Sequence, residues 1–154
     1  MQIRITYSLI KELTVAANML LHPDEYKNLR SVILSTPRSI FSFASNYRQA
    51  IKHTEIIWSD ANIYVEIAFK ELGIKDPGVI SCYLHGISCE GWFDTDDNSI
   101  HVRFPESNGD KNLLHTIIHE ILHLATYDDK YDYSEREEIV DKILAKPQLK
   151  KLLG

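Results

Sequence analysis

The chain has 154 residues, of which 44% are apolar and 25% charged, the size and mixture of one soluble globular domain. Its 17 basic and 22 acidic side chains give a net charge of −5, which argues against broad electrostatic binding to nucleic acid or to anionic lipid. No apolar run reaches the roughly 20 residues of a membrane span, and the first residues lack the pattern of an export signal, so we expect a cytoplasmic protein with no membrane partner.

The first half is predicted to be mainly helical. Apolar residues recur at helical spacing over residues 9–20, and His22-Pro23 is expected to end that helix, because the residue before a proline is pushed out of the α region. A second helix is predicted over residues 25–34, with Thr36-Pro37 interrupting it. The stretch 39–51 is ambiguous between helix and other structure.

A further helix is predicted over residues 61–72, where Ile63, Ile67 and Leu72 share one side. It is expected to end at Gly73, since glycine suits a left-handed helix cap. Aspartate, proline and glycine at 76–78 then favour a turn. We expect one domain over 1–154, with a mainly helical part at 1–75 and a sheet followed by helices at 76–154.

Beyond the turn, β-branched and aromatic residues predict short strands at 79–84, 91–93 and 100–104. The polar run 94–98 is a strong turn signal, so a small antiparallel sheet is expected here. In the last strand, alternation places Ile100, Val102 and Phe104 on one face. His101 and Arg103 then lie on the other face.

Two helices are predicted to close the chain. The first covers about 113–127 and is the longest apolar helical run. The second begins after a polar, aromatic loop, with Ser134 as its N-cap, and continues to Pro147. Its apolar stripe consists of Ile139, Val140, Ile143 and Leu144.

The first of these helices contains His119-Glu120-Ile121-Leu122-His123, the His-Glu-x-x-His pattern. Histidines four residues apart project from one helical face, so both can reach a single Zn²⁺ at about 2.0–2.1 Å. Glu120 then stands beside the metal, where it can take a proton from water. The alternative is that hydrogen bonds to carbonyls or carboxylates satisfy the two rings. His115, one turn earlier, is either a helix-entry residue or a group that faces the substrate.

A catalytic zinc site needs a third protein ligand, and three residues are candidates. Asp129 follows at a spacing from which a turn can return to the metal, although Thr126 stands where such a turn favours glycine. In the final helix, Glu137 falls on the flank of the apolar stripe and Glu138 falls nearly opposite. A capping box with Ser134 would instead engage Glu137. Glu137 is the preferred ligand, with Glu138 and Asp129 left open.

The two cysteines carry a second, weaker metal hypothesis. Cys82, His85 and Cys89 have suitable ligand chemistry, but they lie in an apolar, strand-rich stretch without a fourth partner nearby. We therefore interpret the cysteines as reduced core thiols, with no disulfide expected in a domain of this length.

His119 to His123, followed by an acidic helix, resembles the gluzincin branch of zinc metallopeptidases, in particular the small minigluzincins and the ImmA/IrrE group. The resemblance covers roughly 91–144. Those families place the helix after a short sheet and take a glutamate from a following helix as third ligand. The matching positions are Glu135-Arg136-Glu137 and Glu137-x-x-x-Asp141, although the residue after the matched glutamate is often alanine there and is Glu138 here.

The resemblance implies a zincin-like α+β fold, a Zn²⁺ cofactor and hydrolysis of a peptide or protein substrate. It also makes 100–104 the edge strand above the metal, able to pair with an extended peptide, with His101 or Arg103 in the cleft. A tyrosine hydroxyl could stabilise the oxyanion, and nothing in the sequence selects one. The candidates are Tyr127, Tyr131 and Tyr133.

Two other functions stay open. The spacing of His115, His119 and His123, followed by Leu124 and Tyr127-Asp128, is similar to the YbeY family of metal-dependent endoribonucleases. Those proteins typically have glycine at position 120 and a third histidine at position 129, and the acidic balance fits RNA poorly. The third hypothesis is a non-catalytic, zinc-stabilised domain that binds a protein partner through a closed, four-ligand site.

Overall fold

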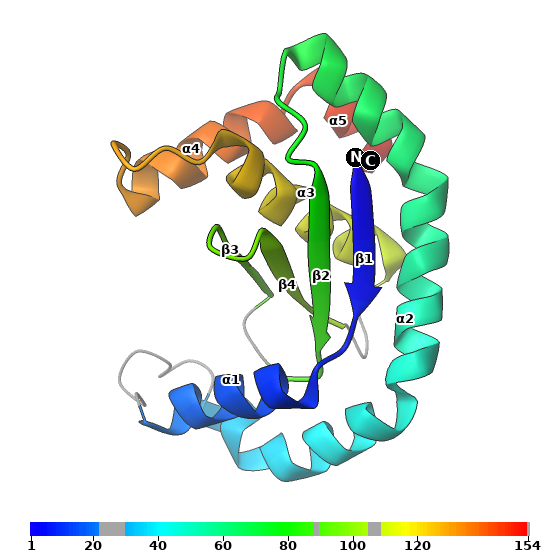
Figure 1. The fold of residues 1–154 in the computed structure, drawn as a ribbon, viewed down its shortest axis with the longest axis vertical. Coiled ribbons are helices and arrows are strands. Elements are labelled where there is room, and N and C mark those ends of the chain that lie inside the picture. The colour runs from blue at the N-terminus through cyan, green and yellow to red at the C-terminus, as the bar shows by residue number, and fades with distance from the viewer. Residues whose placement is uncertain (22–29, 88–89, 105–108, 154) are drawn as a thin grey trace.

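The computed structural model describes residues 1–21, 30–87, 90–104 and 109–153. In these residues the chain forms five helices and a four-stranded sheet, which confirms the α+β class (Figure 1). The elements in chain order are β1 (Gln2–Thr6), α1 (Leu9–Leu21), α2 (Arg30–Leu72), β2 (Val79–His85), β3 (Gly91–Asp94), β4 (Ser99–Arg103), α3 (Asp110–Thr126), α4 (Tyr133–Leu144) and α5 (Pro147–Leu153).

The sheet is mixed, with strand order β1-β2-β4-β3. Strand β2 is parallel to both β1 and β4, whereas β3 and β4 form the predicted antiparallel pair around the polar turn. The expectation of a small sheet that contains an antiparallel pair is therefore confirmed, whereas the parallel pairing of β2 was not predicted and β1 had no predicted counterpart. The expectation that 100–104 forms the edge is wrong. Four of the five residues of β4 are buried, because this strand lies between β2 and β3, and the short, half-buried β3 is the edge.

Helix α2 corrects a second expectation. The predicted break at Thr36-Pro37 is absent, because the helix runs without interruption from Arg30 to Leu72 and follows one side of the molecule (Figure 1). A proline removes only one hydrogen bond of the ladder, and a helix of 43 residues retains the others. The ambiguous stretch 39–51 is thus helical, and Gly73 ends the helix with a φ of +70° as predicted. The motif at His22-Pro23 lies outside the described residues.

The core lies between one face of the sheet and helices α2 and α3. Helix α3 contributes an apolar stripe in which Ile117 is 1% exposed and Ile118, Ile121 and Leu122 are 0% exposed. Alternate residues of the strands face this stripe, among them Leu84, Ile100 and Val102. This packing fixes the rotation of α3 about its own axis, and with it the direction in which the histidines project.

The start of α4 differs from the prediction by two residues. Its N-cap is Asp132, which exchanges the two hydrogen bonds of a capping box with Glu135. Ser134 is therefore not the cap, and Glu137 is not engaged in a capping box. The last predicted helix was expected to end at Pro147. In the structure the short helix α5 begins at this residue, and it buries Leu149. Among the described residues, no helix is long and apolar enough to cross a membrane.

Candidate metal centre

His119 and His123 occupy successive turns of α3 on the side that faces away from the apolar stripe. Their Nε2 atoms lie 3.0 Å apart, and their ring planes are inclined by 70°. His123 is 4% exposed, and the ring of Phe93 from strand β3 stacks on it at 4.9 Å between centroids. Both imidazoles therefore direct the same nitrogen to one point, as the spacing of four residues predicts.

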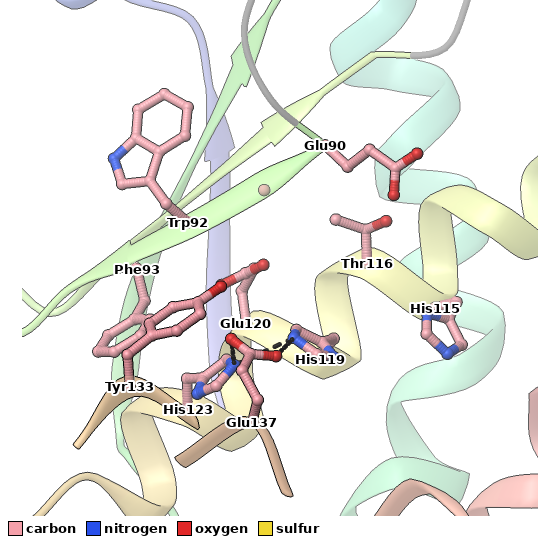
Figure 2. A pocket seen from close by; sticks show the side chains of 11 residues that line it. Glu90, Trp92, Phe93, His115, Thr116, His119, Glu120, His123, Tyr133 and Glu137 are labelled. Carbon is pink, nitrogen blue, oxygen red and sulfur yellow. Dashed lines mark hydrogen bonds and ion pairs between the residues drawn. The ribbon is translucent and has the colours of Figure 1, made fainter. Parts of the chain in front are cut away.

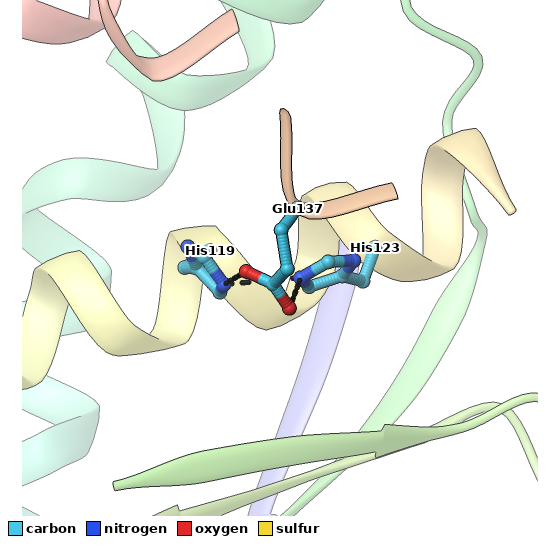
Figure 3. Close-up of side chains that lie close together, drawn as sticks. All are labelled: His119, His123 and Glu137. Atoms are coloured by element: carbon cyan, nitrogen blue, oxygen red, sulfur yellow. Dashed lines mark hydrogen bonds and ion pairs between the residues drawn. The ribbon is translucent and has the colours of Figure 1, made fainter. Parts of the chain in front are cut away.

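Glu137 reaches this point from helix α4. Its Oε2 lies 3.4 Å from Nε2 of His119, and its Oε1 lies 3.2 Å from Nε2 of His123 (Figure 3). Because Asp132 and Glu135 form the capping box, two residues before the predicted one, the Glu137 carboxylate is available for the two histidines. Among the described residues, these three form a group that could hold a metal ion.

The spacing of the three side chains fits a divalent metal. In a tetrahedral site with ligands about 2.0–2.1 Å from the metal, neighbouring donor atoms are about 3.3–3.4 Å apart. The two histidine nitrogens lie 3.0 Å apart, and they lie 3.4 and 3.2 Å from two different oxygens of Glu137. With one donor atom taken from each residue, the three atoms all lie within 4.8 Å of one another. Two neutral imidazoles and one carboxylate are also a donor set that zinc uses in catalytic sites. The residues present therefore fit a zinc ion, with a fourth position left for water or substrate.

The other two candidates for the third ligand point elsewhere. Glu138 is 66% exposed in its side chain and forms an ion pair with Lys142 at 2.7 Å. Asp129 accepts a hydrogen bond from the Tyr127 hydroxyl at 2.7 Å. Of the three carboxylates that the sequence left open, the structure brings only Glu137 to the histidines.

Burial changes the proton affinities of the site. It lowers the pKa of both His119 and His123 from the usual value, despite the opposing charge of Glu137. Both rings are thus favoured in the neutral form that binds metals. Glu120 is 6% exposed, and burial, with a smaller contribution from Glu137, raises its pKa to about 8. This carboxyl can hold or release a proton near neutral pH.

A pocket of about 340 Å³ opens onto the three side chains between β3, α3 and α4 (Figure 2). Its walls include Glu120, Thr116 and the exposed His115, all from α3, and Tyr133 from the start of α4. The opposite wall is the edge strand β3 with the preceding Glu90. Of the three candidate tyrosines, only Tyr133 lines the pocket, since Tyr127 and Tyr131 are not among its lining residues.

Strand β3 comes unusually close to α3 at Gly91. A Cβ atom at this position would lie 2.6 Å from Oε1 of Glu120 and 2.8 Å from Cγ2 of Thr116. Sequence reasoning missed this glycine, and also assigned the groove wall to the wrong strand. The glycine at the start of a predicted strand was the available signal, because glycine there often marks a close backbone approach.

Two sequence candidates lie outside the pocket. His101 is 4% exposed and pairs in register with Trp92, on the sheet face opposite to Phe93. Arg103 is likewise not a lining residue. The hypothesis that either residue lines the cleft is wrong, because β4 is covered by β3 on the side of the groove.

The cysteine hypothesis resolves in favour of a core thiol for Cys82. Its side chain is fully buried among apolar residues, and burial raises the pKa of its thiol to about 12. His85 is hydrogen-bonded to Glu12 and His101 and does not join Cys82 in a metal-binding group. Cys89 lies outside the described residues.

No protein-family model, curated protein or solved structure matches this chain.

Proposed function

We propose that the protein is a zinc-dependent metallopeptidase of zincin-like architecture, in which His119, His123 and Glu137 hold Zn²⁺ and Glu120 is the general base. The observation that carries this proposal is the convergence of Glu137, from a different helix, on the two histidine nitrogens at 3.2 and 3.4 Å. Only three protein donors form the group in the described residues. A fourth position for water or substrate distinguishes a catalytic site from a closed structural one.

A zinc ion at this site would act as a Lewis acid that polarises a carbonyl group and lowers the pKa of water. Glu120 accepts a proton from the attacking water and returns it to the leaving amine. Its burial beside Gly91 supports this role, since the carboxyl is withdrawn from bulk water yet lines the pocket. The hydroxyl of Tyr133, which also lines the pocket, stabilises the oxyanion that forms on the substrate.

The groove favours an extended peptide as substrate. Strand β3 lines the pocket and is the edge of the sheet, with β4 as its neighbouring strand in the described residues. An edge strand can pair with an added strand through its backbone groups. A peptide paired with β3 would place its carbonyl groups along the side of α3 that carries Glu120 and the histidines. This arrangement replaces the sequence expectation that assigned the same role to 100–104.

The test is Glu120→Gln in the zinc-loaded protein. The amide keeps the size of the side chain but cannot accept a proton, so we expect zinc content to stay at one ion per chain. Hydrolysis of a peptide library should fall by about 10²–10⁴-fold, the usual contribution of a general base. Measured zinc content and cleavage by mass spectrometry check both parts.

A matched control is Glu138→Gln, one helix further on and directed into solvent, which should leave both quantities unchanged. If Glu120→Gln retained full hydrolysis, the assignment of the base would be wrong. If the wild-type protein cleaved no peptide with zinc bound, the peptidase proposal would be wrong.

A further inference from the structure

A fully buried carboxylate ties helix α1 to the end of strand β2. Glu12 is 0% exposed, and its Oε1 accepts hydrogen bonds from the backbone N–H groups of Gly86 and Ile87, each at 3.0 Å. Its Oε2 lies 2.7 Å from Nδ1 of His85. A buried carboxylate is costly unless donors surround it, and here three donors do so. They are located in the segment that leads toward β3.

The hydrogen bonds continue across the sheet, on the face away from α3. Nε2 of His85 lies 2.8 Å from Nδ1 of His101, and Nε2 of His101 lies 3.2 Å from the Ser99 hydroxyl. Near this end, the Asp97 carboxylate forms an ion pair with Lys11 of helix α1 at 2.7 Å. A continuous chain of hydrogen bonds therefore runs from Glu12 through His85 and His101 to Ser99.

The middle ring of the chain, His101, is held in its neutral form. Burial, together with the nearby His85, lowers the pKa of His101 to about 3. One nitrogen of a neutral imidazole donates a hydrogen bond and the other accepts one. His101 therefore joins His85 on one side to Ser99 on the other.

Trp92 connects this chain to strand β3. Its indole ring stacks on the ring of His101, with 4.3 Å between centroids and 13° between planes. The His85 ring is also close, at 4.9 Å between centroids. In Figure 2 the Trp92 side chain projects from strand β3 in the direction opposite to Phe93.

The neighbours of Trp92 face the candidate metal centre. Phe93 stacks on His123, and Gly91 lies against Glu120. Strand β3 has only four residues, so its position depends on what holds it from either face. The histidine pair holds one face, and the metal-binding helix α3 meets the other.

We propose that Glu12, His85 and His101 form a positioning network that holds edge strand β3 against helix α3 from the side opposite to the candidate metal centre. None of the three lines the pocket, so the network acts through Trp92 and through the turn at Gly86 and Ile87. The consequence for peptide binding rests on the proposed function. The neutral state of His101 and the order of β3 do not.

The experiment replaces Glu12 by Gln in the full chain. The amide keeps the volume of the side chain but has one acceptor oxygen in place of two, whereas three donors surround the carboxylate. In the wild type at pH 7, ring-nitrogen NMR should show His101 neutral. Backbone amides of β3 should exchange with solvent about tenfold faster in the variant. A doubly protonated His101 in the wild type, or unchanged exchange in β3, would overturn the proposal.

The matched control is Thr54→Val. Thr54 is also 0% exposed, and it lies in α2, outside the network. The substitution removes one buried hydrogen bond, from the Thr54 hydroxyl to the Ala50 carbonyl. Exchange in β3 should stay at the wild-type rate. If this control accelerated β3 exchange as much as Glu12→Gln, the effect would reflect general destabilisation and the positioning role would be refuted.

A kinetic measurement separates this inference from the proposed function. With zinc bound, Glu12→Gln should raise the KM for a cleaved peptide several-fold at unchanged zinc content, because β3 forms the wall on which the peptide lies. A wild-type protein that cleaves no peptide contradicts the proposed function. The NMR and exchange results then decide the network by themselves.

Discussion

At the residue scale, Gly91 has the sharpest steric requirement in the candidate site. A Cβ atom there would lie 2.6 Å from the Glu120 carboxyl, closer than packed atoms approach, so Gly91→Ala must displace the side chain that we propose as the general base. Because a displacement of 1 Å can cost about 10²-fold in rate, we expect kcat to fall by about tenfold or more at constant zinc content. Steady-state kinetics with parallel metal analysis checks this.

The control for this substitution is Gly109→Ala. Gly109 precedes α3, has a negative φ of −63°, and offers a Cβ open space with no heavy atom within 4 Å. The same chemical change should therefore leave kcat unchanged. Equal kinetics for the two variants would show that the close approach of β3 to Glu120 does not position the base.

His101 is the residue whose burial predicts a pH effect on stability. Its pKa is about 3 in the folded protein and about 6.5 when exposed. Between these values the unfolded chain binds a proton that the folded chain does not, so the free energy of unfolding decreases as pH falls through this window. Denaturant unfolding of His101→Gln should show a shallower decrease between pH 6.5 and 4 than wild type. Parallel curves for the two proteins would contradict this prediction.

At the element scale, the start of α4 determines whether Glu137 can act as a ligand. The sequence analysis predicted a capping box at Ser134, which would have engaged Glu137 itself. The structure uses Asp132 with Glu135. The choice between overlapping caps depends on where the loop 127–132 leaves the helix, which local propensity does not encode.

Two single substitutions test this assignment of the cap. Asp132→Ala removes the side-chain acceptor of the Glu135 N–H and should lower the free energy of unfolding by about 1 kcal/mol. Zinc affinity should weaken with it, because α4 carries Glu137. Ser134→Ala should change stability by less than about 0.5 kcal/mol. Thermal unfolding and zinc titration distinguish the two variants. A larger loss of stability in Ser134→Ala than in Asp132→Ala would mean that the helix begins at Ser134.

At the scale of the whole molecule, local patterns predicted the helix that carries the candidate metal ligands, whereas the arrangement of the sheet depended on long-range strand pairing. His119, Glu120 and His123 could be placed on α3 because spacing within one helix needs no tertiary information. The order of the strands in the sheet could not be predicted in this way. Parallel pairing joins β1, β2 and β4 across long stretches of chain, and β3 takes the edge only because the buried β4 occupies the centre.

The candidate third ligand lies between these two cases. A helical wheel put Glu137 on the flank of the apolar stripe, but it could not choose between Glu137, Asp129 and Glu138. Of these three, Glu137 lies beside the two histidines in the structure, because α4 packs on α3, which is a tertiary contact. The buried Glu12, His85 and His101 gave no periodic signal at all, since they belong to three different elements.

Zinc titration of the metal-free protein tests the central claim most directly. We predict one ion per chain for the wild type and for Glu138→Ala, together with a loss of affinity of at least about tenfold for Glu137→Ala, because that variant removes one of three donors. A wild-type chain that binds no zinc, or a Glu137→Ala variant that binds it as tightly as the wild type, would contradict the account.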